Sequence, residues 1–265
     1  MPTDIVFSFT GLSERGGRTG PHRDGFGIAF YEGRGLRLFR DQAPSAESEI
    51  ARLVRSTPIR STAVIGHIRA ANSGPVCLAN THPFTRELWG RHWVFAHNGQ
   101  LHGFHPPPGF YWPIGDTDSE RAFCALLDVL RASFSAPPPL GELTETLVSC
   151  CRQYARHGVF NILLSNGDWL FSYCSTKLAC ITRCAPFGTA RLKDADLSVD
   201  FSAVTRPSDV VTVIATEPLS GDETWLLYAP GQWRLWIEGE CAAEGREQSC
   251  DLAPLDQKMS LENGL

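Results

Sequence analysis

The sequence lacks any apolar stretch approaching the roughly 20 consecutive residues that a membrane-spanning helix needs. Residues 1–4 (MPTD) also lack the basic segment and apolar run of a secretory signal peptide. No cluster of lysine and arginine stands out, and the formal net charge is −5, so nothing indicates electrostatic attraction to nucleic acid or to an anionic membrane. These absences favour a cytoplasmic protein that acts on small molecules.

Metal-binding cysteine pairs and nucleotide-binding glycine motifs are lacking as well. The nine cysteines contain no C-x-x-C pair, and their odd number in a chain without an export signal argues against a disulfide framework. We therefore expect reduced thiols in the core and no metal site. Because no P-loop and no G-x-G-x-x-G motif is present, no cofactor is expected either.

What is present is the composition of an ordinary globular protein. The 265 residues are 43% hydrophobic and 20% charged, and a chain of this length can bury one sizeable core. We expect one domain over residues 1–237. Residues 238–265 mix Glu, Gly, Ala, Ser and Gln without periodicity, which predicts a flexible C-terminal tail.

Hydrophobic periodicity predicts strands, then two central helices, then more strands, which is an order that suits a layered α+β domain. Strands are predicted at 26–31, 36–39, 63–68, 93–96, 159–164, 169–174, 178–182, 209–215 and 233–237. Helices are predicted at 48–55, from Thr117 to the proline run at 137–139, and at 140–156.

Two local signals sharpen this prediction. Thr117 and Glu120 have the spacing of a capping box, so the first central helix should begin at Thr117. Asn98 and Gly99 follow the apolar run 93–96, and an Asn-Gly pair favours a tight turn at the end of that strand.

Several polar motifs flank the predicted elements. They are Arg15-Gly16, residues 20–29 (GPHRDGFGIA), residues 66–69 (GHIR), residues 80–84 (NTHPF), residues 96–101 (AHNGQL) and residues 117–120 (TDSE). None of them is decisive alone. In this order and spacing they resemble the glutaminase domain of class II glutamine amidotransferases, and specifically the stand-alone, YafJ-like bacterial branch.

This resemblance implies a fold and a reaction. The fold is the four-layer αββα sandwich of N-terminal-nucleophile hydrolases, in which two antiparallel sheets stack between helix layers. In this family the α-amino group of an N-terminal cysteine is the base for its own thiol. The thiolate attacks the side-chain amide of glutamine, ammonia leaves, and water resolves the γ-glutamyl thioester. Glutamine or another γ-glutamyl amide is therefore the expected substrate.

Five residues match functional positions of the family. Asn98 and Gly99 match the oxyanion hole, which stabilises the tetrahedral intermediate. Arg69 is expected to bind the substrate α-carboxylate through its planar guanidinium, and Asp118 the α-ammonium group. Arg15 matches an arginine that supports the surroundings of the nucleophile. Structural explanations exist beside these roles: an Asn-Gly turn, a structural ion pair for Arg69, and a carboxylate that complements the helix dipole.

Three histidines near these motifs, His67, His82 and His97, invite comparison with a Cys–His hydrolase or a metal site. Each one flanks an apolar strand, however, and such a histidine is more often a packing residue whose ring nitrogens are satisfied. We therefore expect a structural role for all three.

The sequence departs from the family at the nucleophile. Met1 is followed by Pro2, and the earliest cysteine, Cys77, is internal and has no free α-amino group. We expect the reading frame to continue upstream by a short strand of about ten residues that opens with Met-Cys. The alternative is a catalytically inactive protein that retains a glutamine or γ-glutamyl pocket. No synthase domain is recognisable after the glutaminase region, so either a separate partner protein takes the ammonia or simple hydrolysis of a γ-glutamyl amide is the whole reaction.

Overall fold

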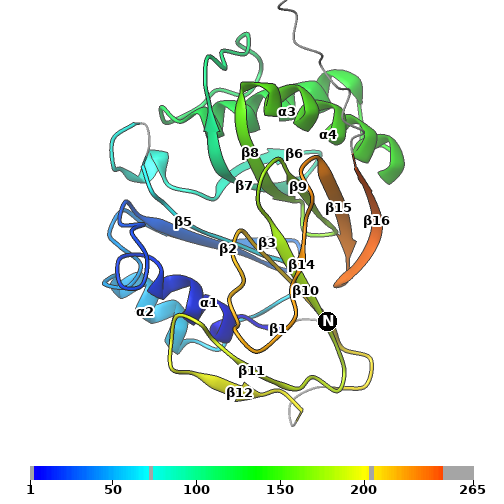
Figure 1. Ribbon diagram of the computed structural model, residues 1–265. Coiled ribbons are helices and arrows are strands. Elements are labelled where there is room, and N and C mark those ends of the chain that lie inside the picture. Colours follow the sequence, from blue (N-terminus) through cyan, green and yellow to red (C-terminus); the bar gives the residue numbers. More distant parts are fainter. Residues whose placement is uncertain (1–2, 72–73, 203–205, 247–265) are drawn as a thin grey trace, which may run out of the picture.

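The computed structural model describes residues 3–71, 74–202 and 206–246, and it stacks two helix pairs and antiparallel sheets in layers (Figure 1). The helices are α1 (Val6–Glu14), α2 (Glu49–Ser56), α3 (Asp118–Ser133) and α4 (Leu140–Tyr154), with short 3-10 turns at Leu78–Asn80 and Ala155–His157. Side-chain caps start two of these helices, because Thr117 accepts a hydrogen bond from the Glu120 N–H and Ser48 accepts from two N–H groups of α2.

The largest sheet is antiparallel throughout and lies beneath α3 and α4. Its strand order is β16 (Glu240–Arg246), β15 (Gln232–Ile237), β9 (Leu170–Cys174), β8 (Gly158–Ser165), β7 (Arg91–Leu101) and β6 (Phe84–Leu88). Successive side chains along each strand of this sheet point to its two opposite faces. Trp93 and Phe95 pack with α3 and α4, whereas Val94 and Ala96 pack against the next layer.

Two three-stranded sheets form that next layer. They have the strand orders β3 (Gly35–Asp41), β2 (Phe26–Glu32), β5 (Val64–Ile68), and β13 (Val210–Ala215), β10 (Ala179–Cys184), β14 (Leu226–Leu227). Two short pairs accompany them, β1 (Thr3–Asp4) with β4 (Arg60–Ser61) and β11 (Thr189–Arg191) with β12 (Ser198–Asp200).

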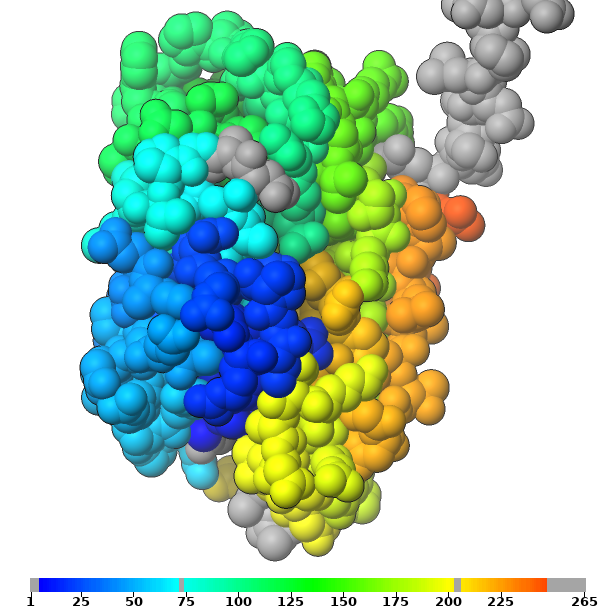
Figure 2. Space-filling view, turned by 60° about the vertical axis from the view of Figure 1, so that its left-hand side comes forward, coloured from blue at the N-terminus to red at the C-terminus, as the bar shows by residue number. Residues whose placement is uncertain are grey.

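The helices α1 and α2 form the fourth layer. Phe26, Ile28 and Phe30 of β2 point toward them, while Ala29 and Tyr31 of the same strand point toward the large sheet. Helix α1 also packs on residues 190–219, and Figure 2 shows it (dark blue) on the surface between light blue and yellow segments. The layer order is therefore helix, sheet, sheet, helix, as predicted, although two smaller sheets take the place of one inner sheet.

Two predictions need correction, and one helix was missed. The strand predicted at 93–96 extends through Leu101, and Asn98-Gly99 forms no turn, because β8 continues to pair with both residues. The tail predicted at 238–265 is wrong for residues 240–246, since β16 pairs with β15, while residues 247–265 lie outside the described residues. Helix α1 was not predicted, because its sequence VFSFTGLSE alternates like a strand and has no side-chain cap.

Candidate active site

A small cavity of about 210 Å³ lies where β5 and β7 end and α3 begins. Four of the five predicted site residues line it, namely Arg69, Asn98, Gly99 and Asp118. They come from three segments that are far apart in the sequence. The structure thus brings together the predicted oxyanion-hole and substrate-binding residues in one polar cavity.

Asn98 and Gly99 lie within β7 and face this cavity from a paired strand. The backbone carbonyl of Asn98 accepts a hydrogen bond from Asn161 Nδ2 at 3.1 Å, which anchors it to β8. Gly99 has a φ of +150°, and a Cβ at this position would lie 2.0 Å from the Val159 carbonyl oxygen. Only glycine fits here, because the contact is with backbone that cannot rotate away.

Asp118 occupies the first turn of α3, and its carboxylate is fixed by the adjacent strand. Its Oδ2 accepts a hydrogen bond from the Leu101 N–H at 2.6 Å. Backbone groups two residues apart in a strand point the same way, so the Gly99 N–H is directed to the Asp118 side of β7. A backbone donor and a carboxylate thereby share one side of the strand.

Arg69 follows β5 directly and is 4% exposed. Its backbone N–H donates to the Gly25 carbonyl at 2.8 Å, which extends the pairing of β5 with β2 by one residue. Its Nη1 donates to the Pro75 carbonyl at 3.2 Å. A buried guanidinium at the edge of a cavity is suited to binding a carboxylate.

Histidines contribute more to this cavity than the sequence suggested. His22, His67, His82 and His97 all line it. The rings of His67 and His82 stack with their centroids 4.2 Å apart. Within the part of the chain that the structure describes, His67 Nδ1 and both ring nitrogens of His82 are buried without a hydrogen-bond partner. Within the protein chain itself, these two rings thus differ from the fully satisfied packing histidines that the sequence predicts.

His97 is satisfied, and its partners define its tautomer. Its Nε2 lies 2.9 Å from the Val159 carbonyl, which can only accept, so Nε2 carries the proton. Its Nδ1, 2.8 Å from Ser119 Oγ, then accepts from that hydroxyl. His97 thereby links β7, β8 and the first turn of α3.

Burial keeps these rings neutral. It lowers the pKa of His67 to about 3, with the neighbouring His97, His22 and Arg69 adding to the effect and a backbone hydrogen bond opposing it. Burial also lowers the pKa of His82 well below its ordinary value. The pKa of His97 is lowered by burial as well, against the opposing effects of Val159 and Asp118. These three rings therefore add no charge at neutral pH, and Arg69 and Asp118 bring the guanidinium and the carboxylate of the cavity.

A second, much larger cavity of about 1220 Å³ adjoins the small one. The two cavities share His22, His67, Ile68 and Asn98 as lining residues. Strand β5, at the edge of its sheet, lines the large cavity with Val64, Gly66 and Ile68, and the edge strand β13 lines it along its whole length. The large cavity therefore separates two strand edges and opens onto Asn98.

Arg15 and Cys77 lie outside the small cavity. Arg15 lines the large one, and its guanidinium donates to Asp194 at 2.6 Å and to the carbonyls of Glu217 and Pro218 at 3.0 and 2.7 Å. Cys77 lines neither cavity, and no cysteine does among the described residues. Arg15 thus ties α1 to residues 194–218, and its role near the nucleophile stays a prediction.

Comparison with known proteins identifies the family. The family model described as class II glutamine amidotransferases matches residues 1–260. The chain belongs to this family. YafJ of Escherichia coli (strain K12) is 55% identical over 242 residues, which cover 91% of this chain and 95% of YafJ. A Haemophilus influenzae relative is 46% identical over 244 residues, 92% of this chain and 83% of that protein.

Solved structures agree with this assignment. A predicted glutamine amidotransferase from Pseudomonas aeruginosa PA01 has a TM-score of 0.74 and 62% sequence identity, covering 87% of this chain and 91% of that chain. Glutamine phosphoribosylpyrophosphate amidotransferase from B. subtilis has a TM-score of 0.55 at 14% identity, covering 91% and 45% of the two chains. The second likeness concerns the fold alone. The α+β sandwich predicted for this amidotransferase-family chain is confirmed.

Two further features of this family member concern ligands and membranes. Among the described residues, no cluster of three or more His, Cys, Asp or Glu side chains could hold a metal ion. Within the same residues, no helix combines the length and the apolar character that crossing a membrane requires.

Proposed function

We propose that this protein is a cytoplasmic enzyme that hydrolyses the side-chain amide of glutamine or of another γ-glutamyl amide. The observation that carries the proposal is that Arg69, Asn98, Gly99 and Asp118 line one cavity of about 210 Å³. A volume of this order suits a small amino acid, and the two charges suit a zwitterion.

The charged residues would bind the amino-acid end of the substrate. Arg69 is proposed to hold the α-carboxylate through its guanidinium, and Asp118 the α-ammonium through the carboxylate oxygens that face the cavity. With this end fixed, the side-chain amide extends toward Asn98 and Gly99. The Asn98 side-chain amide and the Gly99 N–H would then donate to the oxyanion that forms during attack.

The nucleophile is proposed to be an N-terminal cysteine on a strand that precedes Met1 and occupies the large cavity. The backbones of Ala63 and Arg69 bond to the β2 side. Backbone groups of successive residues in a strand point to opposite sides, so the N–H and C=O groups of Val64, Gly66 and Ile68 point away from β2. The same three residues line the large cavity, so these groups would offer a pairing edge to an added strand. The residues shared by the two cavities mark where its first residue would reach the substrate.

The chemistry follows from that position. The α-amino group takes the thiol proton, and the thiolate attacks the amide carbon to form a tetrahedral intermediate. The C–N bond breaks, the departing nitrogen takes the proton from the α-ammonium group, and ammonia leaves. Water then attacks the thioester carbon and gives up a proton to the α-amino group, the C–S bond breaks, the cysteine sulfur takes that proton, and the γ-carboxylic acid, which is glutamate when glutamine is the substrate, is released. The ammonia passes to solvent or to a separate acceptor protein.

A covalent probe tests this proposal. The protein extended to an N-terminal cysteine is treated with a diazoketone analogue of glutamine, and the adduct is located by mass spectrometry. We expect one adduct on the N-terminal cysteine, prevented by excess L-glutamine. An adduct on an internal cysteine, or no protection by L-glutamine, would reject the mechanism.

A second candidate is a protein that binds γ-glutamyl compounds without hydrolysing them. It is favoured by one observation, that no cysteine lines either cavity among the described residues. Release of ammonia from glutamine by any natural form of the protein would exclude it.

A further inference from the structure

A buried asparagine, Asn80, lines neither cavity but bonds to the segments next to Arg69 and Asp118. Asn80 is 0% exposed and ends the 3-10 turn Leu78–Asn80. Its Nδ2 donates to the Pro75 carbonyl at 3.0 Å, and the same carbonyl accepts from Arg69 Nη1 at 3.2 Å. Asn80 and Arg69 therefore share one backbone acceptor.

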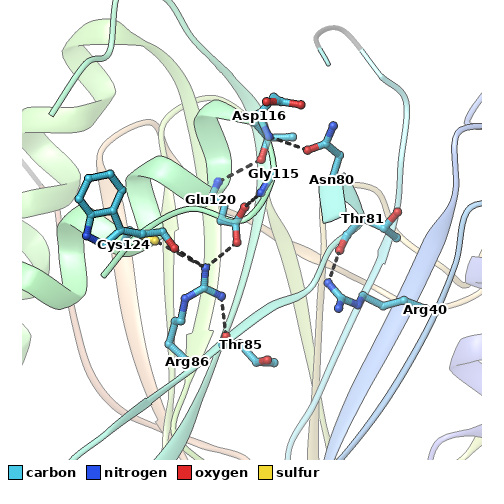
Figure 3. Close-up of polar contacts among 11 residues, drawn as sticks. Arg40, Asn80, Thr81, Thr85, Arg86, Gly115, Asp116, Glu120 and Cys124 are labelled. Atoms are coloured by element: carbon cyan, nitrogen blue, oxygen red, sulfur yellow. Dashed lines mark hydrogen bonds and ion pairs between the residues drawn. The ribbon is translucent and has the colours of Figure 1, made fainter. Parts of the chain in front are cut away.

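The other end of the Asn80 amide faces the segment that leads into α3. Its Oδ1 accepts from the Asp116 N–H at 2.8 Å, two residues before Asp118 (Figure 3). These two partners fix the amide orientation, since a carbonyl requires the NH₂ group and an N–H requires the oxygen. Asn80 also packs closely against Gly115, since a Cβ on Gly115 would lie 2.2 Å from Asn80 Oδ1.

A buried ion pair holds the same segment from its other side. Glu120 is 1% exposed, and its Oε2 accepts from the Gly115 N–H at 2.7 Å while its Oε1 accepts from Arg86 Nη2 at 2.6 Å (Figure 3). Arg86 also donates to the carbonyls of Thr85 and Trp112, at 2.8 and 3.0 Å. Gly115 and Asp116 are thus bonded to Glu120 of α3 and to Asn80, and Glu120 is in turn paired with Arg86 of β6.

We propose that Asn80, together with the Arg86–Glu120 pair, is a positioning device that sets the separation between Arg69 and Asp118. The connection runs from Arg69 through the Pro75 carbonyl and Asn80 to Asp116, and Asp118 is fixed beyond it by the Leu101 N–H. A fixed separation selects ligands that carry an α-carboxylate and an α-ammonium on the same carbon. This inference rests on the proposed function, because it assumes that these two residues bind those groups.

Ligand discrimination tests the inference without any catalytic step. Calorimetry on the 265-residue chain compares L-glutamate with glutarate, which lacks the α-ammonium group. The intact chain should prefer L-glutamate. Asn80→Asp keeps the acceptor for Asp116 but turns the group facing Pro75 from donor to acceptor, and it should reduce that preference by about tenfold, the equivalent of one charge-assisted hydrogen bond. Glutarate, which needs Arg69 alone, should lose much less affinity.

A second variant separates positioning from folding. Gly115→Ala removes no polar group but pushes against Asn80 and the Ala79 carbonyl of the same 3-10 turn, and it should reduce the same preference. Gly141→Ala, where a Cβ meets nothing within 4 Å, should not. Asn166→Asp, in the turn between β8 and β9, is the control for the asparagine change. A merely structural role would lower the melting temperature and affect both ligands equally.

The outcomes distinguish the two proposals. If the intact chain binds neither L-glutamate nor L-glutamine, the proposed function fails. If it binds L-glutamate no better than glutarate, or if folded Asn80→Asp and Gly115→Ala keep the full preference, the positioning inference alone is overturned.

Discussion

Gly99 is the residue whose substitution has the clearest structural consequence. In Gly99→Ala the new Cβ would lie 2.0 Å from the Val159 carbonyl oxygen, so the strand must shift and its N–H must leave the oxyanion position. In the form that carries the N-terminal cysteine, we expect kcat for glutamine to fall by about 10²–10³-fold, as for loss of one oxyanion donor. Steady-state kinetics measure it.

Gly103 supplies the control for this prediction. It also has a positive φ, but a Cβ there meets nothing within 4 Å. Gly103→Ala should therefore keep its activity. An unchanged kcat in Gly99→Ala would remove Gly99 from the oxyanion hole.

Arg69 is predicted to act in binding more than in the chemical step. Arg69→Lys keeps the charge but loses the planar fork, and a carboxylate is held equally in the ground and transition states. We expect the KM for glutamine to rise about tenfold, with a smaller change in kcat. Arg37→Lys, in an exposed pair with Glu32, is the control. A KM that stays within error of the unsubstituted value would exclude Arg69 from the substrate site.

Local motifs were sufficient to find some site residues and insufficient for others. Arg69, Asn98, Gly99 and Asp118 each sit in a short polar pattern at the end or start of an element, and the structure gathers them. Asn80 lay within one of these motifs, but its role is set by bonds to the main chain of Pro75 and Asp116. Such contacts depend on the tertiary structure, and they produce no recognisable pattern of residue spacing in the sequence.

At the scale of elements, β16 shows why a segment without periodicity can still be a strand. Its burial is mostly low, and its residues ECAAEGR offer no alternation, yet it completes the ladder of β15. Segment 240–246 becomes a strand because it pairs with the free edge of β15, and no local pattern in the sequence indicates this pairing. Asn98-Gly99 shows the opposite case: the dipeptide predicts a turn, but both residues are in a strand. Pairing with β8, which continues beside them, outweighs the turn preference of the dipeptide.

Truncation tests the contribution of β16. A chain that ends after Ile237 leaves β15 as an unpaired edge and uncovers Trp233, which packs partly against the main core. We expect a lower melting temperature and more aggregation than in a chain that ends after Arg246. Circular dichroism and light scattering compare the two lengths. Equal melting temperatures would mean that β16 does not belong to the folded domain.

At the scale of the whole molecule, the histidines between the sheets predict a pH dependence of stability. The folded state keeps His67 neutral, with its pKa at about 3, whereas the unfolded chain takes up a proton near the ordinary value. The contribution of His67 is therefore complete above about pH 6.5 and is lost as the pH falls toward 3.

This dependence can be measured by urea unfolding at pH 7 and pH 5. When the pH is lowered from 7 to 5, the free energy of unfolding should fall in both proteins. The fall in the unsubstituted protein should exceed the fall in His67→Gln by about 2 kcal/mol. His92→Gln, at an exposed position, is the control. Equal losses in His67→Gln and the unsubstituted protein would show that His67 already titrates normally in the folded state.

The layered architecture could be predicted, and the cavities could not. Alternation of apolar residues in β2 and β7 gives each sheet two buried faces, and the motif resemblance supplied the four-layer order. Where the sheets leave a space depends on which strand edges remain unpaired. The large cavity between β5 and β13, and its junction with the small one, appear only in three dimensions.

The most direct test of the account compares two lengths of the protein in one glutaminase assay. The 265-residue chain and a form extended upstream to an N-terminal cysteine are both checked for folding by circular dichroism, and release of ammonia from L-glutamine is measured. We predict that the extended form releases ammonia and that the folded 265-residue chain is slower by several orders of magnitude, because it lacks both nucleophile and base. Similar rates for the two forms would place the nucleophile among the internal cysteines and contradict the account.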